Sequence, residues 1–264
     1  MTPLSSPTNQ PQPRLRNRGS VNRVALITGA SRGLGLALSR ALAARGWSLV
    51  IDARGEPALE EVAAELRAAA GTRNEQGRAA EVWALAGDVA DQAHRRQLAQ
   101  AVTELGGLDA LVHNASLLGP SPQPSLRDYP LDVLEQVYRV NVLAPLALTQ
   151  LLLPRLRPGG RILAITSDAA REPYPGWGGY GSSKAALEQF TNILAAEHPD
   201  LRIYRVDPGD MRTRMHQEAF PGEDISDRAA PEERVPGLLR LLEEDLPSGR
   251  YEAAALAAAR AGVR

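Results

Sequence analysis

The sequence contains no cysteine, and aromatic side chains make up only 4% of its 264 residues. Without cysteine the chain has no disulfide framework, no thiolate nucleophile and no thiolate metal site. Neither sign of charge dominates, because 30 basic side chains stand against 31 acidic ones. No overall field therefore favours nucleic acid or an anionic membrane surface.

Long apolar runs are also missing. No run approaches the roughly 20 residues that a membrane-crossing helix needs, and the first residues lack the apolar centre of a secretory signal. Together these absences predict a soluble, cytoplasmic protein that binds a small molecule, with no nucleic acid and no membrane as partner.

The length and composition of the chain predict a single folded domain. Hydrophobic residues make up 44% of the sequence, enough for a sizeable core, and α/β folds of this size commonly form one domain. Residues 1–22 are rich in Pro, Gln, Ser, Asn and Arg and have almost nothing to bury, so we expect a disordered arm there. The folded domain is expected over residues 23–250, followed by a tail over residues 251–264.

From residue 23 onward, apolar strands alternate with amphipathic helices. Strands are expected near residues 23–28, 48–52, 81–89, 108–116, 161–167 and 201–209, and helices near 57–70, 92–105, 131–154 and 180–197. Continuous apolar strands separated by helices are typical of a parallel sheet covered on both faces. The predicted fold class is therefore α/β, a doubly wound parallel sheet.

A glycine-rich turn follows the first expected strand, in "TGASRGLG" at residues 28–35. In a doubly wound sheet, ligands bind beyond the carboxyl ends of the strands, so residues just after each strand are the informative ones. Gly29 permits a tight turn, Gly33 lets the backbone approach a pyrophosphate, and Gly35 lets the helix pack closely. Tight turns also need glycine for conformational reasons alone, so this turn by itself is weak evidence for a ligand.

Six ordered motifs over residues 23–213 give the chain a resemblance to the short-chain dehydrogenase/reductase family. "TGASRGLG" matches the family's TGxxxGxG motif, and "GDV" at 87–89 resembles the exit of its third strand. "HNAS" at 113–116 resembles its NNAG motif, with departures at His113 and Ser116. An asparagine in the long helix, Tyr-x-x-x-Lys in "YGSSK", and "DPGDMRT" at 207–213, which resembles PGxxxT, complete the set.

The resemblance implies a Rossmann-like single domain, a nicotinamide cofactor and four catalytic residues. The catalytic residues are expected to be Asn141, Ser167, Tyr180 and Lys184. The residues expected at the cofactor are Gly29, Ser31, Arg32, Gly33, Leu34, Gly35, Arg54, Asp88, Val89, Asn114, Ala115, Tyr180, Lys184, Pro208, Gly209, Met211 and Thr213. In this scheme Asp88 contacts the adenine amine, and Asn141 holds a water in a proton relay through Lys184.

The Tyr-x-x-x-Lys spacing also has a direct chemical interpretation. Residues at i and i+4 project from one helical face, so Tyr180 and Lys184 can point into the same crevice. A phenol has an unperturbed pKa near 10, and a nearby ammonium is expected to lower it. Ser167, thirteen positions before Tyr180, can hydrogen-bond a substrate oxygen on which charge develops. The alternative without a catalytic role is that Tyr180 and Lys184 belong to the surface of an amphipathic helix at an oligomer interface.

The implied reaction is hydride transfer between nicotinamide and a carbonyl or secondary alcohol, with Tyr180 as general acid or base. No metal is needed, and the four histidines show no ligand spacing. Two other classes stay open. One is a non-catalytic NADP-binding regulatory protein of the same fold. The other is an epimerase or dehydratase that uses a bound nicotinamide.

The second expected strand ends with an acid, Asp52, and a base, Arg54, either of which could determine whether NAD(H) or NADP(H) binds. An acid there would bind the ribose and repel a 2′-phosphate, whereas an arginine would attract the phosphate. Counted from Gly46, the acidic position of NAD-dependent relatives falls at Ala53, and Arg54 falls at the basic position of NADP-dependent relatives. Arg32 is a second candidate for the phosphate. NADP(H) is therefore favoured. NAD(H) stays possible, because a shift of the strand exit by one residue would place Asp52 at the acidic position. Otherwise Asp52 caps a turn or points to a helix.

The substrate side is expected to involve a mobile lid over residues 214–235, which has many charges and few apolar anchors. The candidate pocket residues are Leu117, Leu118, Trp177, Met211, Met215 and Phe220. A homodimer or homotetramer is expected, with dimerisation through the helices near 131–154 and 180–197. Near the C-terminus, "GRYEA" can supply a last strand, and the alanine-rich remainder is either a short helix or a frayed end.

Overall fold

The computed structural model describes residues 22–69 and 79–261. The arm predicted over residues 1–22 lies, apart from Asn22, outside the described residues. The described chain alternates strands and helices from β1 to α9, as the sequence predicts.

Seven strands form one sheet, in the order β3-β2-β1-β4-β5-β6-β7, and every neighbouring pair is parallel. The strands are β1 (Val24–Ile27), β2 (Ser48–Ala53), β3 (Val82–Ala86), β4 (Leu108–His113), β5 (Leu156–Ile165), β6 (Arg202–Asp207) and β7 (Gly249–Glu252). The order reverses between β1 and β4, where a doubly wound sheet opens a crevice beyond its strand ends. The predicted fold class is confirmed.

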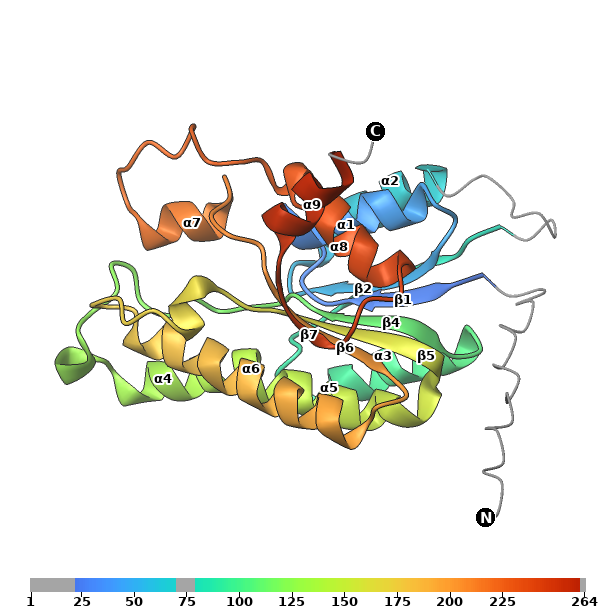
Figure 1. The fold of residues 1–264 in the computed structure, drawn as a ribbon, viewed down its shortest axis with the longest axis horizontal. Coiled ribbons are helices and arrows are strands. Elements are labelled where there is room, and N and C mark those ends of the chain that lie inside the picture. Colours follow the sequence, from blue (N-terminus) through green and yellow to red (C-terminus); the bar gives the residue numbers. More distant parts are fainter. Residues whose placement is uncertain (1–21, 70–78, 262–264) are drawn as a thin grey trace, which may run out of the picture.

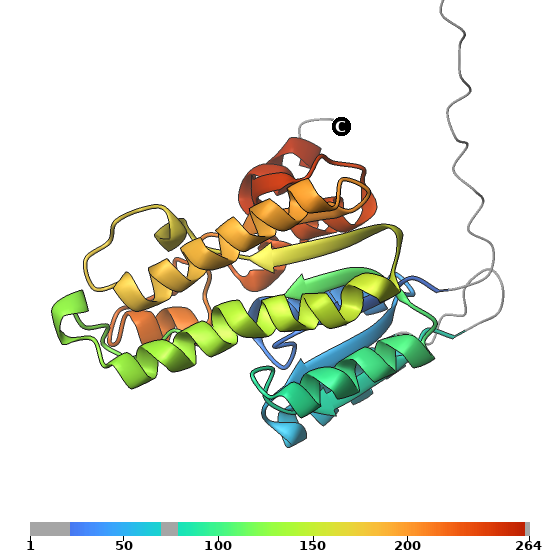
Figure 2. The ribbon, with the colours of Figure 1, turned by 90° about the horizontal axis from the view of Figure 1, so that it is seen from below.

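Helices cover both faces of the sheet (Figures 1 and 2). On one face lie α1 (Gly33–Ala43), α2 (Glu56–Ala69), α8 (Val235–Glu243) and α9 (Ala253–Ala261). On the other lie α3 (Gln92–Glu104), α4 (Leu131–Tyr138), α5 (Ala144–Leu152) and α6 (Gly178–Glu197). The short helix α7 (Arg214–Ala219) stands at the end of the sheet, and the single turns are η1 (Leu126–Asp128), η2 (Arg139–Leu143), η3 (Leu153–Arg155), η4 (Asp168–Ala170) and η5 (Pro231–Glu233).

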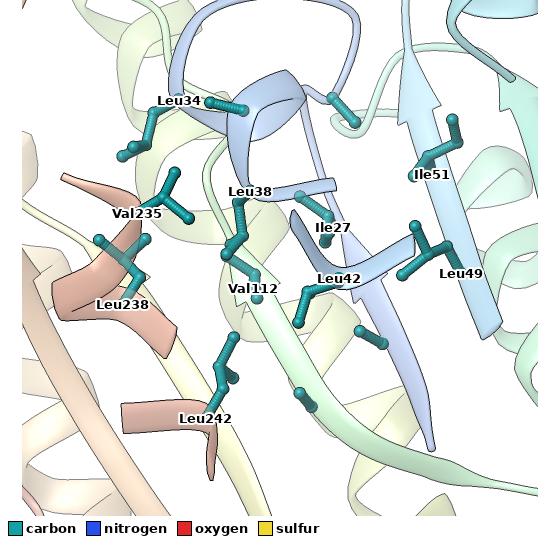
Figure 3. Close-up of a cluster of buried hydrophobic side chains, with 14 of the residues drawn as sticks. Ile27, Leu34, Leu38, Leu42, Leu49, Ile51, Val112, Val235, Leu238 and Leu242 are labelled. Atoms are coloured by element: carbon teal, nitrogen blue, oxygen red, sulfur yellow. The ribbon is translucent and has the colours of Figure 1, made fainter. Parts of the chain in front are cut away.

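Each face of the sheet has its own hydrophobic core. Helix α1 places Leu34, Leu38 and Leu42 one turn apart on its inner face, where they pack with Ile27 of β1 and Leu238 of α8 (Figure 3). The opposite core joins β-strand residues to α3 and α5. Because the sheet is covered on both faces, its central strands are buried along their whole length and mostly apolar, which explains why the sequence shows apolar runs rather than alternation.

The helical stretch Leu131–Arg155 is long and apolar enough, by length and composition, to cross a membrane, with a mean hydropathy of 1.2 in its most apolar part. Polar side chains such as Glu135, Arg139 and Asn141 interrupt the stretch, so it contains no continuous apolar run of that length. Val137, Leu148 and Leu152 of this stretch are fully buried within the protein, so the apolar composition belongs to a core helix. Its middle widens into a π turn at η2, which carries Asn141.

The C-terminal segment supplies the last strand. Arg250 and Tyr251 pair with Arg205 and Val206 in parallel, and α9 follows directly. The expectation that "GRYEA" completes the sheet is confirmed, and the alanine-rich remainder is a helix as far as residue 261.

The core predicts a matched pair of stability changes. Leu42 is fully buried, so Leu42→Ala should lower the free energy of unfolding by about 2–5 kcal/mol, through lost burial and the remaining cavity. Leu131 is 73% exposed, and Leu131→Ala should change it by no more than about 0.5 kcal/mol. Urea denaturation of the two variants checks this, and equal losses would contradict the assignment of Leu42 to the core.

Candidate active site

A cavity of about 980 Å³ opens at the carboxyl ends of the strands. It gathers side chains that lie far apart in the sequence, from the glycine turn after β1 to the segment after β6. All six candidate pocket residues line it, and so do all the predicted cofactor and catalytic residues except Gly35 and Asn141. These two lie just behind the wall, where each contacts a residue that does line the cavity.

The glycine turn is tied to the exit of β4. Thr28 Oγ1 accepts hydrogen bonds from the backbone N–H groups of Asn114 and Ala115, both at 3.0 Å. The Asn114 amide in turn donates to the carbonyls of Thr28 at 2.8 Å and Gly29 at 3.0 Å. A Cβ atom on Gly29 would lie 2.9 Å from the Ala115 Cα, and Gly29 has φ of 67°. Space and backbone conformation therefore both require glycine here.

Gly35 has a packing role. A Cβ atom on it would lie 2.5 Å from both the Asn114 Nδ2 and the Gly29 carbonyl oxygen. The absence of a side chain lets the first turn of α1 approach the turn that precedes it. This is the role that the spacing of the glycines predicts for Gly35, and it explains why Gly35 is not exposed to the cavity.

Asp52, the acid that could have selected NAD(H), is occupied elsewhere. It is 1% exposed, and its Oδ1 accepts a hydrogen bond from the Gly29 N–H at 2.8 Å. Its Oδ2 lies 3.1 Å from His94 Nε2, which must donate because a carboxylate can only accept. Both oxygens therefore stabilise the glycine turn, and the alternative that Asp52 caps a turn is confirmed.

Arg32 and Arg54 have exposed side chains on the wall of the cavity. Neither guanidinium has an ion pair or a hydrogen bond with another described residue. Asp88 is also exposed at the cavity and accepts a hydrogen bond from the Ala90 N–H at 2.8 Å. The β2 end of the cavity thus presents two cations with no acidic side chain of the described chain paired to them, an arrangement suited to a phosphate group.

Tyr180 and Lys184 lie on the same face of α6 and both reach the cavity. The Lys184 Nζ lies 5.5 Å from the centre of the Tyr180 ring. Burial raises the pKa of Tyr180 well above its ordinary value, a hydrogen bond from Ser116 lowers it, and the charges of Asp207 and Asp168 raise it further. The expectation that Lys184 lowers this pKa was wrong for the protein alone, because desolvation of the phenolate dominates.

Lys184 is the only lysine in the sequence. Its side chain is 2% exposed, its Nζ donates to the Ile165 carbonyl at 2.8 Å, and burial lowers its pKa to about 7. Near neutrality the ammonium is therefore only partly charged, which also limits its effect on Tyr180. Burial, with the charge of Lys184, lowers the pKa of the neighbouring His113 to about 3, so His113 is neutral and bonds Thr149 Oγ1 at 2.8 Å.

Asn141 is held rigidly by the π turn. Its Oδ1 accepts from the Leu117 N–H at 2.8 Å and from Ser116 Oγ at 3.2 Å. Its Nδ2 donates to the Leu117 carbonyl and to Ser183 Oγ, both at 2.9 Å. Single π turns inside α-helices occur frequently at functional sites. The predicted water relay would need some of these contacts to be exchanged.

Ser167 follows β5 at the mouth of the cavity. Its Oγ donates to Asp168 Oδ1 at 2.9 Å and accepts from the Ala169 N–H at 3.2 Å, which caps the η4 turn. The other Asp168 oxygen accepts from the Tyr174 hydroxyl at 3.0 Å. The hydroxyl of Ser167 therefore lines the same cavity as Tyr180, with a carboxylate beside it that sequence reasoning did not anticipate.

A charged cluster beneath the site was also missed. Arg250 of β7 donates to Glu188 Oε1 at 2.9 Å and to Asp207 Oδ2 at 2.8 Å, and all three side chains are largely buried. The Asp207 Oδ1 accepts from the Gly209 N–H at 2.9 Å. Glu188 follows Lys184 by four residues, and this spacing could have predicted that it lies on the same inner face of α6. Arg250 gave no such signal, because its partners come from tertiary structure.

The far end of the cavity is aromatic. The ring of Trp177 meets the ring of Tyr180 edge-on, with 5.8 Å between the ring centres. The centre of the Phe220 ring lies 5.7 Å from that of Trp177. Leu118 is buried in the same cluster, with Met215 packed against it. Phe220 follows α7, so part of the segment 214–235 contacts the cavity wall rather than standing free. Within residues 22–69 and 79–261, no group of three or more His, Asp or Glu side chains is placed to hold a metal ion.

The fold recurs in known proteins. A family model for short chain dehydrogenases matches residues 23–224. The uncharacterized oxidoreductase YciK of Escherichia coli K12 is 33% identical over 240 residues, which span 89% of this chain and 90% of the relative. A benzil reductase ((S)-benzoin forming) of Saccharomyces cerevisiae is 31% identical over 229 residues, with coverage of 83% and 81%.

Similar solved structures include cofactor complexes. A short chain dehydrogenase of Shigella flexneri 2a complexed with NADP is 31% identical, with a TM-score of 0.78 and coverage of 88% of this chain and 98% of that one. A short chain dehydrogenase of Escherichia coli CFT073 complexed with NADPH is 32% identical, with a TM-score of 0.78 and coverage of 88% and 97%.

Because Lys184 is the only lysine, its ionisation can be measured without interference from other lysine signals. With lysine labelled with ¹³C at Cε, the folded protein should give one Lys184 signal that titrates near pH 7, well below the ordinary lysine pKa of 10.5. Between these values the unfolded chain binds a proton that the folded chain does not, so the free energy of unfolding should rise with pH across this window. Lys184→Met should lack that rise, and a midpoint near 10.5 in the folded protein would contradict the effect of burial.

Proposed function

Because the chain belongs to the short-chain dehydrogenase/reductase family of oxidoreductases, we propose that it is an NADP(H)-dependent carbonyl reductase or alcohol dehydrogenase. The observation that carries this proposal is the shared cavity of Tyr180, Lys184 and Ser167, with a buried lysine one helical turn from the phenol. These groups suit the transfer of a proton to or from the oxygen of a carbonyl or carbinol.

The cofactor side of the cavity fits NADP(H). Arg32 and Arg54 would hold the 2′-phosphate, and the occupied carboxylate of Asp52 removes the group that would repel it. Because Gly29 has no side chain, the turn after β1 stays tight, and a pyrophosphate could approach the N-terminus of α1. The complexes of two similar proteins with NADP and NADPH support the same cofactor. When bound, the nicotinamide supplies or accepts the hydride.

The residues of this chain would supply the proton transfer and the hydrogen bonds to substrate and cofactor. Tyr180 would hold the transferred proton at its phenol oxygen, and Ser167 would donate a hydrogen bond to the substrate oxygen. Lys184 would bind the cofactor ribose and exchange protons with solvent through Asn141. A raised pKa keeps the phenol protonated near neutrality, which is the form that can donate a proton to a carbonyl oxygen.

The substrate end favours an apolar, preferably aromatic, carbonyl compound. Trp177 and Phe220 face the part of the cavity next to Tyr180, with Leu118 and Met215 beside them. Flat rings gain most from such aromatic walls. The yeast relative named benzil reductase is consistent with a carbonyl flanked by rings.

Assembly and location are part of the same proposal. Leu143 on the long helix is 55% exposed and Ile193 on α6 is 48% exposed, on helices that lie side by side under the sheet (Figure 2). Exposed apolar side chains on adjacent helices support a homodimer, or a homotetramer built from it. The absence of cysteine is consistent with the cytoplasm.

Removing the phenol hydroxyl should separate chemistry from binding. Tyr180→Phe should lower kcat for carbonyl reduction at least about 100-fold, because the proton donor is lost. The dissociation constant of NADPH should stay nearly unchanged. The assay follows NADPH absorbance with a panel of ketones, aldehydes and quinones, and Tyr138→Phe serves as the control outside the cavity. Wild-type activity in Tyr180→Phe would mean that another group is the acid.

Removing the arginine at the β2 exit should change cofactor preference. Arg54→Ala should weaken NADPH binding about 10- to 100-fold by loss of a charge-assisted contact with the phosphate, and NADH binding much less. Arg45→Ala is the matched control, because Arg45 is exposed but does not line the cavity. Side-by-side fluorescence titrations measure both constants, and equal losses for the two cofactors would exclude Arg54 as the phosphate ligand.

A further inference from the structure

A buried histidine lies behind the cavity wall, at the end assigned to the cofactor. His94 stands in the first turn of α3, on the face of the sheet opposite α1 (Figure 1), and is only 3% exposed. It does not line the cavity, but its Nε2 lies 3.1 Å from Oδ2 of Asp52, which does. Nothing in the proposed reaction uses this histidine.

The surroundings of His94 determine which of its ring nitrogens carries the proton. Its Nδ1 has no hydrogen-bond partner among residues 22–69 and 79–261, so a proton there would be buried without an acceptor. Its Nε2 faces a carboxylate oxygen, which can only accept. Because an unpaired buried donor is costly, the proton belongs on Nε2 and is donated to Asp52.

Asp52 connects the histidine to the glycine turn. Its Oδ1 accepts from the Gly29 N–H at 2.8 Å, and its backbone carbonyl accepts from the Ala30 N–H at 2.9 Å. A carboxylate that is 1% exposed needs donors on both oxygens to offset the loss of water. His94 supplies the donor on Oδ2, so the carboxylate is fixed at both ends and stays directed at Gly29.

The same imidazole lies against the exit of β3. A Cβ atom on Gly87 would lie 2.5 Å from Cγ and 2.7 Å from Cε1 of His94. Gly87 has no positive φ, so the space taken by the ring, rather than the backbone conformation, requires glycine here. The next residue is Asp88, which is expected at the adenine. His94 therefore lies between the two strand exits that would receive the adenosine half of the cofactor.

We propose that His94 is a positioning residue for cofactor binding, which keeps the Asp52 carboxylate on the Gly29 N–H and out of the cavity. The inference rests on the proposed function, in which the glycine turn receives the pyrophosphate of NADP(H). Without His94, one oxygen of a buried carboxylate loses its donor. The carboxylate can regain a partner only by turning toward water in the cavity, which releases the turn and places negative charge beside the phosphates.

The first test compares binding with turnover. His94→Leu fills the space without a donor and should raise the dissociation constants of NADPH and of adenosine 2′,5′-bisphosphate about tenfold. Its kcat at saturating NADPH should stay near that of the wild type, because the catalytic residues are unchanged. His94→Gln, whose amide N–H can replace Nε2–H, should recover most of the affinity. His198→Leu is the control, because His198 lies outside the cavity. Unchanged dissociation constants in His94→Leu would overturn the proposal.

A second pair of variants separates this role from a direct effect on the cofactor. Gly87→Ala should push the imidazole off Asp52 and weaken NADPH binding about as much as His94→Leu. In a His94→Ala background the same change should cost little more, because no ring remains to be displaced. Equal losses in the two backgrounds would mean that the added methyl group acts without the histidine, and this result would also overturn the proposal.

A third measurement uses the wild-type protein without cofactor. With histidine labelled with ¹⁵N, the signals lost in His94→Gln identify His94, and its Nε2 should carry a proton. An unprotonated Nε2 would overturn the proposed contact with Asp52. If the wild type bound neither NADPH nor adenosine 2′,5′-bisphosphate, the proposed function itself would be wrong, and the inference would fail with it.

Discussion

The contact between the exits of β1 and β4 is the constraint on which the site depends. Asn114 and Ala115 donate four hydrogen bonds to Thr28 and Gly29 across the point where the strand order reverses, and these bonds fix the glycine turn against the loop after β4. Asp52 holds the same turn from the other side through the Gly29 N–H. A parallel sheet alone brings strand ends to one edge, but these bonds set the width of the crevice there.

Charge is distributed unevenly around that crevice. At the β2 end lie Arg32 and Arg54, which have no ion pair with any residue that the structure describes. In the middle, Tyr180 and Lys184 are buried and carry little charge near pH 7, and aromatic rings line the opposite end. Below the middle, Arg250 pairs with both Glu188 and Asp207, and Arg171 also pairs with Glu188, so each buried acid has a cationic partner. A cavity organised in this way can bind an anionic cofactor at one end and an apolar substrate at the other.

The sequence predicted the fold and much of the site because both follow from local periodicity. Apolar runs and glycine spacing located the strand exits, and an i, i+4 spacing placed Tyr180 and Lys184 on one face. Asn141 needed the family resemblance, since nothing local marks a π turn. The direction of the Tyr180 pKa was wrong because burial is a tertiary property. Ser116 was visible only as a departure from a motif, and Arg250 not at all, because its partners on β6 and α6 are remote in sequence.

The position of Arg250 on the last strand has a consequence for synthesis of the chain. During translation, the glycine turn, Tyr180 and Lys184 all emerge from the ribosome before residue 250, so Glu188 and Asp207 at first have no Arg250 to neutralise them. The sheet can form as far as β6 at that stage, but Glu188 then has only Arg171 as a cationic partner, and Asp207 still lacks the guanidinium that offsets the cost of its burial. The active site therefore reaches its final electrostatic state only when β7 docks, which couples maturation of the enzyme to completion of nearly the whole polypeptide.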